Sequence, residues 1–81
     1  MKVTVFVSPK KGSLDPQGSA VQQAMHSLDY QQASEVRVGK IIEWVTDEKD
    51  SPEMRKAIDE LCRNLLSNPV LEDYRYELQE S

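Results

Sequence analysis

The sequence predicts a small α+β domain in which an antiparallel sheet carries two helices on one of its faces. Three observations support this class: β-branched stretches that alternate with polar residues, two amphipathic stretches of helical period, and their order along the chain. The predicted order is strand, helix, one or two strands, helix and strand, which is related to ferredoxin-like folds. With 81 residues, the chain has room for a single domain spanning residues 1–81.

The first strand is predicted from Val3, Val5 and Val7, which alternate with other residues and define one buried face. Phe6 falls on the opposite face, so we expect both faces of the sheet to be covered at least in part. A second subunit could supply that cover, because so small a core favours a homodimer or a higher oligomer. Pro9 ends the strand.

The first helix is predicted to begin with Asp15 as its N-cap and Pro16 at its first position, where the missing N–H would be unpaired anyway. Apolar residues then recur at helical spacing as far as Leu28, which indicates one apolar stripe. The stripe consists of Val21, Ala24, Met25 and Leu28. We therefore expect a helix over residues 16–28.

The middle segment, residues 35–46, is rich in valine, isoleucine and tryptophan but is interrupted by Gly39 and Lys40. Two interpretations fit this pattern. Gly39 is either a bulge in one long bent strand or the first residue of a two-residue hairpin turn. The sequence leaves both open, so the segment is predicted as one strand or two.

The second helix is predicted to start at Ser51 as its cap and Pro52 as its first residue, and to stop before Asn68 and Pro69. Seven apolar residues at three- and four-residue spacing make it the clearest element, and we expect them to form the core stripe. They are Met54, Ala57, Ile58, Leu61, Cys62, Leu65 and Leu66.

The last strand is predicted over residues 70–78, with Tyr74, Tyr76 and Leu78 on one face. Trp44 in the middle segment is, like the two tyrosines, an aromatic residue on a predicted strand whose side chain carries a polar atom. Such residues are favoured at protein interfaces, but they also fill the core between a helix layer and a sheet. Both roles stay open for these three aromatic side chains.

Composition limits the partners of the chain. Fourteen acidic and 10 basic residues give a net charge of -4, and Lys10–Lys11 is the only close basic pair, which argues against nucleic acid. No stretch approaches the ~20 apolar residues of a membrane helix, and the first residues do not resemble a signal peptide. The single cysteine, Cys62, allows no internal disulfide. We therefore expect a reduced, cytoplasmic protein with neither nucleic acid nor membrane as partner.

Each residue type that could carry chemistry has a structural interpretation. Cys62 lies on the apolar stripe of the second helix, where a buried thiol is inert. His26 is the single histidine and has no second metal ligand at a suitable spacing, so we interpret it as a surface or interface residue. Asp15 is a helix cap, and residues 47–50 form a solvated charged turn. We accordingly predict no catalytic, cofactor-binding or metal-binding residue in this chain.

Three blocks in this sequence resemble the PurS family, the small subunits of phosphoribosylformylglycinamidine synthase. The first is LDPQGSAVQQAMHSL at residues 14–28, the second is EVRVGKIIE at residues 35–43, and the third is NPVLEDYRYEL at residues 68–78. They occur in the family's order and spacing and extend over essentially the whole chain.

The resemblance implies a non-catalytic assembly subunit that associates with itself and bridges a glutaminase subunit, PurQ, and a synthetase subunit, PurL. It implies a role in purine biosynthesis, where the complex uses ATP, magnesium and glutamine to convert formylglycinamide ribonucleotide to formylglycinamidine ribonucleotide. The subunit itself would bind no cofactor and would support ammonia transfer. The residues alone leave an alternative, a ferredoxin-like regulatory module that binds a small molecule between subunits.

Overall fold

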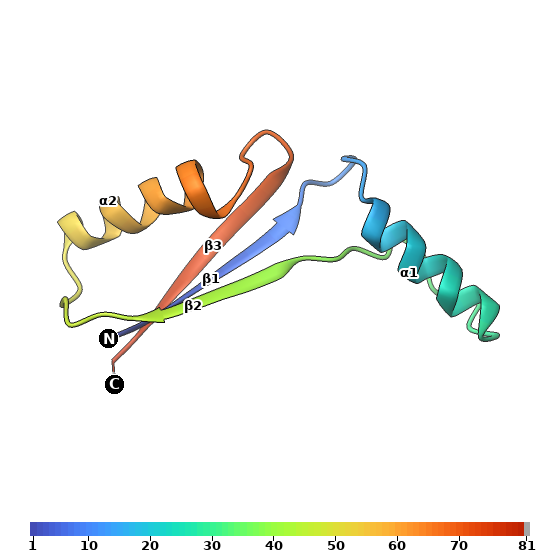
Figure 1. The fold of residues 1–81 in the computed structure, drawn as a ribbon, viewed down its shortest axis with the longest axis horizontal. Coiled ribbons are helices and arrows are strands. Elements are labelled where there is room, and N and C mark those ends of the chain that lie inside the picture. Colours follow the sequence, from blue (N-terminus) through green and yellow to red (C-terminus); the bar gives the residue numbers. More distant parts are fainter. Residues whose placement is uncertain (81) are drawn as a thin grey trace.

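The chain folds into a three-stranded antiparallel sheet with two helices (Figure 1), and the computed structural model describes residues 1–80. This is the α+β class that the sequence predicts, with one strand in the middle segment. The elements are β1 (Lys2–Pro9), α1 (Pro16–Ser27), β2 (Lys40–Val45), α2 (Pro52–Leu61), the π-helical turn η1 (Cys62–Leu66) and β3 (Glu72–Gln79).

The strand order is β2-β1-β3, and β1 pairs antiparallel with both neighbours. In this register Val5 lies opposite Ile42 on one side and Tyr76 on the other. Residues directly opposite each other share a face, so the predicted valine face continues across all three strands. Val3 and Val5 are 0% exposed, as expected for the central strand of the sheet.

Helix α2 packs on the valine face and closes the core. The buried residues are Val3, Val5 and Val7 from β1 together with Met54, Ile58 and Cys62 from α2 and η1. Three residues of the predicted core stripe, Ala57, Leu61 and Leu65, are instead exposed, Leu61 by 41% and Leu65 by 73%. The buried residues of α2 and η1 recur at a spacing of four, and Leu61 lies about 100° around the helix from Cys62. The apolar stripe is thus wider than the face that the sheet covers.

A polar contact fixes α2 above β3. The Tyr74 hydroxyl donates a 2.5 Å hydrogen bond to Asp59, which also lies 3.3 Å from the Arg63 guanidinium. The bond to Asp59 stabilises the protonated phenol and raises the pKa of Tyr74 to about 12. Trp44 and Tyr76 are half-buried and, like Tyr74, pack against the core cluster. In this chain the strand aromatics therefore serve the domain's own core.

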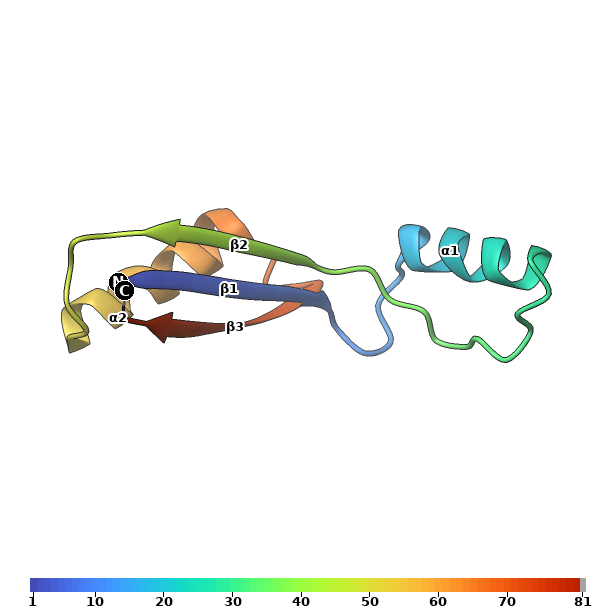
Figure 2. The same ribbon diagram turned by 90° about the horizontal axis from the view of Figure 1, so that it is seen from below.

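The first helix does not lie where the sequence predicts. Figures 1 and 2 show α1 held out beyond the end of the sheet, whereas α2 alone covers the sheet face. The Cα radius of gyration is 16.1 Å, against about 12 Å for a compact chain of this length. The prediction that both helices cover one face of the sheet is therefore wrong for α1, which does not lie on the sheet of its own chain.

Gly39 explains part of this departure. The middle segment forms a strand only from Lys40, so Gly39 is neither a bulge nor a hairpin turn but the residue that precedes β2. A Cβ at Gly39 would lie 2.5 Å from the carbonyl oxygen of Val7. The chain passes closely over the end of β1 here, and residues 35–38 continue away from the sheet, alongside α1.

Candidate functional site

Helix α1 and the segment that returns beside it, residues 33–38, form a single unit that we call the arm. Asp15 caps the helix as predicted, because one carboxylate oxygen accepts a 3.1 Å hydrogen bond from the Gly18 N–H. Its other oxygen accepts a 2.9 Å hydrogen bond from the Val38 N–H in the returning segment. These bonds, the one from Val38 above all, lower the pKa of Asp15. The carboxylate is thus an ionised link between both parts of the arm.

Two further side chains of α1 bind the backbone of the returning segment. Gln22 Oε1 accepts a 3.2 Å hydrogen bond from the Val36 N–H, and His26 Nε2 lies 2.9 Å from the Ala33 carbonyl oxygen. Asp15, Gln22 and His26 lie on one face of α1 because their spacings of seven and four match whole helical turns. Together they hold residues 33–38 along this face.

Gly18 lies on the same face of α1 and permits this approach. It is buried, and a Cβ built on it would overlap the carbonyl oxygen of Val36. The glycine costs helix propensity but allows the returning backbone to lie directly against the helix. The sequence alone does not reveal this use of Gly18, because the backbone that approaches it is distant in the chain.

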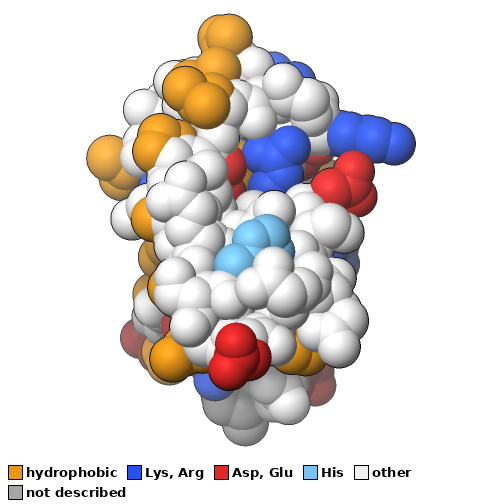
Figure 3. Space-filling model, turned by 90° about the vertical axis from the view of Figure 1, so that its right-hand side faces the viewer, with side chains coloured by type: hydrophobic (Ala, Val, Ile, Leu, Met, Phe, Trp, Pro, Cys, Tyr) orange, Lys and Arg blue, Asp and Glu red, His pale blue; other side chains and the backbone are white. Residues whose placement is uncertain are grey.

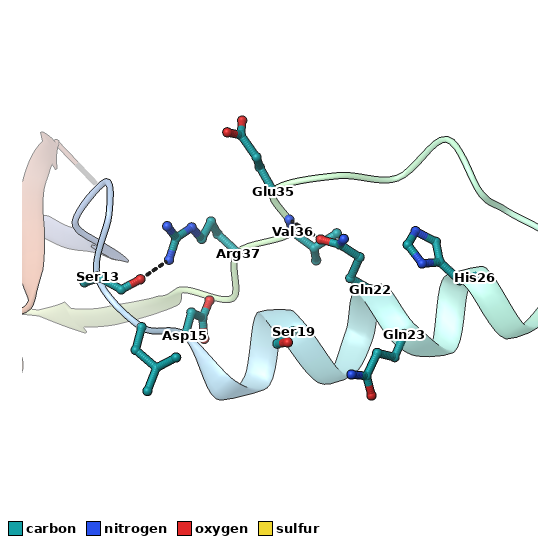
Figure 4. A pocket seen from close by; sticks show the side chains of 10 residues that line it. Ser13, Asp15, Ser19, Gln22, Gln23, His26, Glu35, Val36 and Arg37 are labelled. Carbon is teal, nitrogen blue, oxygen red and sulfur yellow. Dashed lines mark hydrogen bonds between the residues drawn. The ribbon is translucent and has the colours of Figure 1, made fainter.

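A polar groove of about 320 Å³ lies between α1 and the returning segment, and Figure 4 shows the side chains that line it. Arg37 turns toward the loop before α1 and donates a 2.7 Å hydrogen bond to the Ser13 carbonyl oxygen, while Glu35 points away from the helix. Figure 3 shows the chain's single histidine side chain, in pale blue, at the surface of this end of the molecule. Three of the polar side chains here, Asp15, Gln22 and His26, bind backbone atoms of the arm.

The remaining candidates lie away from the groove. Cys62 is fully buried beneath α2, and burial together with the nearby Asp59 charge raises the pKa of its thiol. In the predicted charged turn, Asp50 pairs with the Arg55 guanidinium at 2.7 Å. Within residues 1–80, no group of three or more His, Cys, Asp or Glu side chains could hold a metal ion. None of the helices described for this chain is long and apolar enough to cross a membrane.

The other side of the arm is apolar and exposed. Val21 in α1 is 39% exposed and Leu28 at its C-cap is 82% exposed, and both lie more than a quarter of a turn around the helix from Asp15. Leu14, which precedes the cap and is 87% exposed, lines the groove instead. Moreover, the twelve residues of α1 include no Asp, Glu, Lys or Arg. Depletion of charge around an exposed apolar stripe is typical of the core of a protein interface. This absence of charge is the sequence signal that could have identified the arm.

The fold and the exposed stripe thus define a small α+β protein with one helix that lies away from its sheet and exposes an apolar side. The chain belongs to the PurS family: the family model described as phosphoribosylformylglycinamidine (FGAM) synthase matches residues 2–80. The PurS subunit of this synthase from Bacillus subtilis is 51% identical over 79 residues, which cover 98% of this chain and 93% of the relative.

Solved structures agree with this assignment. A crystal form of B. subtilis PurS superposes with a TM-score of 0.87 at 48% identity and covers 98% of both chains. A chain in the structure of PurLQS from Thermotoga maritima, 22% identical, has a TM-score of 0.77 and covers 94% of this chain and 93% of that one. At that identity the second likeness concerns the fold.

Proposed function

We propose that this chain is the non-catalytic assembly subunit of phosphoribosylformylglycinamidine synthase in purine biosynthesis. In this role it bridges the glutaminase subunit, PurQ, and the synthetase subunit, PurL, and supports the transfer of ammonia between them. It also associates with itself and works in the cytoplasm. The observation that carries the proposal is the PurS family match over residues 2–80.

In the proposed complex, glutaminase activity releases ammonia from glutamine, and the synthetase uses ATP and magnesium to add it to formylglycinamide ribonucleotide. The products are formylglycinamidine ribonucleotide, glutamate, ADP and phosphate, with one water consumed in glutamine hydrolysis. This chain contributes surfaces to the complex, and the arm is the most prominent of them. The assembly with PurL and PurQ is supported by the fold that this chain shares with a chain of the T. maritima PurLQS structure.

The alternative of a ligand-binding regulatory module would need free polar groups in a pocket. The groove of the arm is the natural place for a ligand, but Asp15, Gln22 and His26 already bind the backbone there. Their hydrogen bonds position the returning segment, and a ligand would have to displace it to use them. The arrangement therefore favours the assembly subunit.

Reconstitution with the synthetase and glutaminase subunits tests this role. We expect glutamine-dependent product formation with ATP to fall at least tenfold when this chain is omitted, because ammonia then escapes between uncoupled subunits. Product formation from added ammonium salt should fall much less, since the synthetase alone receives ammonia from solution. Equal losses with both nitrogen sources would contradict a role in coupling the two subunits.

A further inference from the structure

We infer that the hollow at the junction of the arm and the sheet binds an acidic surface of the synthetase–glutaminase pair. This inference rests on the proposed function, because it specifies where on this chain the other subunits dock. The hollow, which we call the junction hollow, has a volume of about 250 Å³ and is lined by Pro9, Lys11, Glu35 and Arg37. Pro9 ends β1 and Arg37 belongs to the returning segment, so the sheet and the arm both contribute to it.

Two cations of the junction hollow keep their charge available to a partner. Lys11 and Arg37 are exposed, and neither forms an ion pair within residues 1–80. The charge of Arg37 contributes to the lowered pKa of Asp15. Both oxygens of Asp15, however, accept hydrogen bonds from backbone N–H groups, those of Gly18 and Val38. The two cations are therefore free of direct ionic contacts in the part of the chain that the structure describes.

The backbone that carries these two cations is held in place. The Ser13 N–H donates a 3.1 Å hydrogen bond to the Lys10 carbonyl oxygen, which closes a turn around Lys11. Gly12 supplies the positive φ of 86° in this turn. Arg37 Nη1 donates a 2.7 Å hydrogen bond to the Ser13 carbonyl oxygen, which ties the turn to the returning segment and leaves other guanidinium N–H groups for a carboxylate. Groups held in this way lose less conformational freedom when a partner binds.

Charge is distributed unevenly along the sheet, although the whole chain carries a net charge of -4. Lys10, Lys11 and Arg37 lie where β1 ends and the arm begins. The acidic turn at residues 47–50 lies at the other end of the sheet, because it follows β2, which runs antiparallel to β1. Figure 3 shows basic side chains, in blue, on the upper part of the end that carries the arm. An acidic partner surface is therefore attracted to the junction and repelled by the opposite end of the sheet.

A protein surface fits the junction hollow better than a small free anion. Glu35 lines the same hollow and points away from α1 (Figure 4), so one negative charge accompanies the two cations. All three charged side chains are exposed to solvent, which weakens their hold on a lone anion. A protein surface adds further contacts, for example with Leu14, which is 87% exposed in the adjoining groove. We therefore expect aspartate or glutamate side chains of a partner subunit at Lys11 and Arg37.

Charge substitutions test this contact by measuring how tightly this chain binds the mixed synthetase and glutaminase subunits. Lys11→Glu should raise the dissociation constant at least about tenfold, because like charges then face each other. Lys11→Glu combined with Arg37→Glu should raise it at least about 100-fold. Glu35→Gln should instead lower it about twofold to threefold, since it removes a negative charge that faces the acidic partner surface. Higher NaCl concentration should weaken wild-type binding, because salt screens exposed charges.

Lys49→Glu is the matched control, because Lys49 is exposed in the turn at the other end of the sheet and its substitution changes the net charge equally. It should leave the dissociation constant within about twofold of the wild-type value. Lys11 is exposed in a turn, so circular dichroism should show that Lys11→Glu folds. This variant keeps the test decisive even if Arg37→Glu disturbs the arm by losing its bond to Ser13.

An unchanged dissociation constant in Lys11→Glu, an equal change in Lys49→Glu, or a changed mass of the chain alone in sedimentation equilibrium would each overturn the inference. Saturable binding of inorganic phosphate to the chain alone, abolished by Lys11→Glu, would also overturn it, because the hollow would then be a site for a small anion. Variants that bind like the wild type refute this contact alone, whereas equal losses with both nitrogen sources in the reconstitution refute the proposed function. A wild type that binds neither subunit would overturn both.

Discussion

An Ile58→Ala variant is expected to lose about 2–5 kcal/mol of its free energy of unfolding. Ile58 is 3% exposed and lies in the middle of α2, against the central valines of β1. Removing its side chain leaves a cavity between α2 and β1, the central strand of the sheet. Since a domain of this size has only about 5–15 kcal/mol of stability, the loss should be a large part of the total.

Urea unfolding followed by Trp44 fluorescence measures this loss. Val45→Ala is the control, because Val45 is 73% exposed and its truncation should change the free energy by about 0.5 kcal/mol or less. Leu61→Ala is the informative comparison: its exposure predicts a much smaller loss than Ile58→Ala when the chain is kept dilute enough to be monomeric. Losses of similar size for Ile58→Ala and Val45→Ala would contradict the core described above.

A Gly18→Ala variant should detach the returning segment from α1, although alanine is the better helix former by about 1 kcal/mol. The new methyl group would overlap the backbone carbonyl of Val36, which cannot move without breaking the bonds of Asp15 and Gln22 to the same segment. Overpacking of this kind costs about 1–3 kcal/mol. The arm should therefore lose its hydrogen bonds while α1 itself remains helical.

Amide hydrogen exchange at Val36 and Val38 reports this detachment residue by residue. Both amides are hydrogen-bonded to side chains of α1, so their exchange in the Gly18→Ala variant should accelerate at least tenfold. Ser19→Ala is the matched control, since position 19 already carries a Cβ and is exposed in the same turn. Unchanged protection of both amides in Gly18→Ala would mean that the arm does not depend on close backbone contact.

The local elements could be predicted from sequence because their signals are local. Asp15 and Ser51 cap helices that begin with proline, and both caps accept the expected bond, from Gly18 and from Met54. The alternation in β1 and β3 gave the correct face for each residue, since a period of two follows directly from strand geometry. The proposed function was inferred from the family resemblance, because composition alone did not indicate it.

The position of α1 could not be predicted because it depends on contacts that are distant in sequence. An amphipathic helix between two strands normally covers the sheet. The lack of charge in α1 marks it as unusual, but it does not show that the polar face of the helix binds residues 33–38. The same limitation applies to Leu61: periodicity identifies an apolar stripe, but the part that a sheet covers depends on how the helix is rotated. Here Asp59 and Tyr74 set that rotation.

The central claim is that this chain contributes binding surfaces to the synthase but no catalytic group. Titration of variants of this chain to saturation tests the claim most directly. His26→Ala, Arg37→Ala and Arg75→Ala would each be added in rising amounts to fixed synthetase and glutaminase subunits, and glutamine-dependent product formation measured. A lost interface contact weakens binding, and excess subunit offsets it, so every folded variant should reach the wild-type plateau. Loss of a catalytic acid or base lowers the plateau itself by about 10²–10⁴-fold. A folded variant that assembles normally but whose plateau activity is lowered by such a factor would contradict the claim.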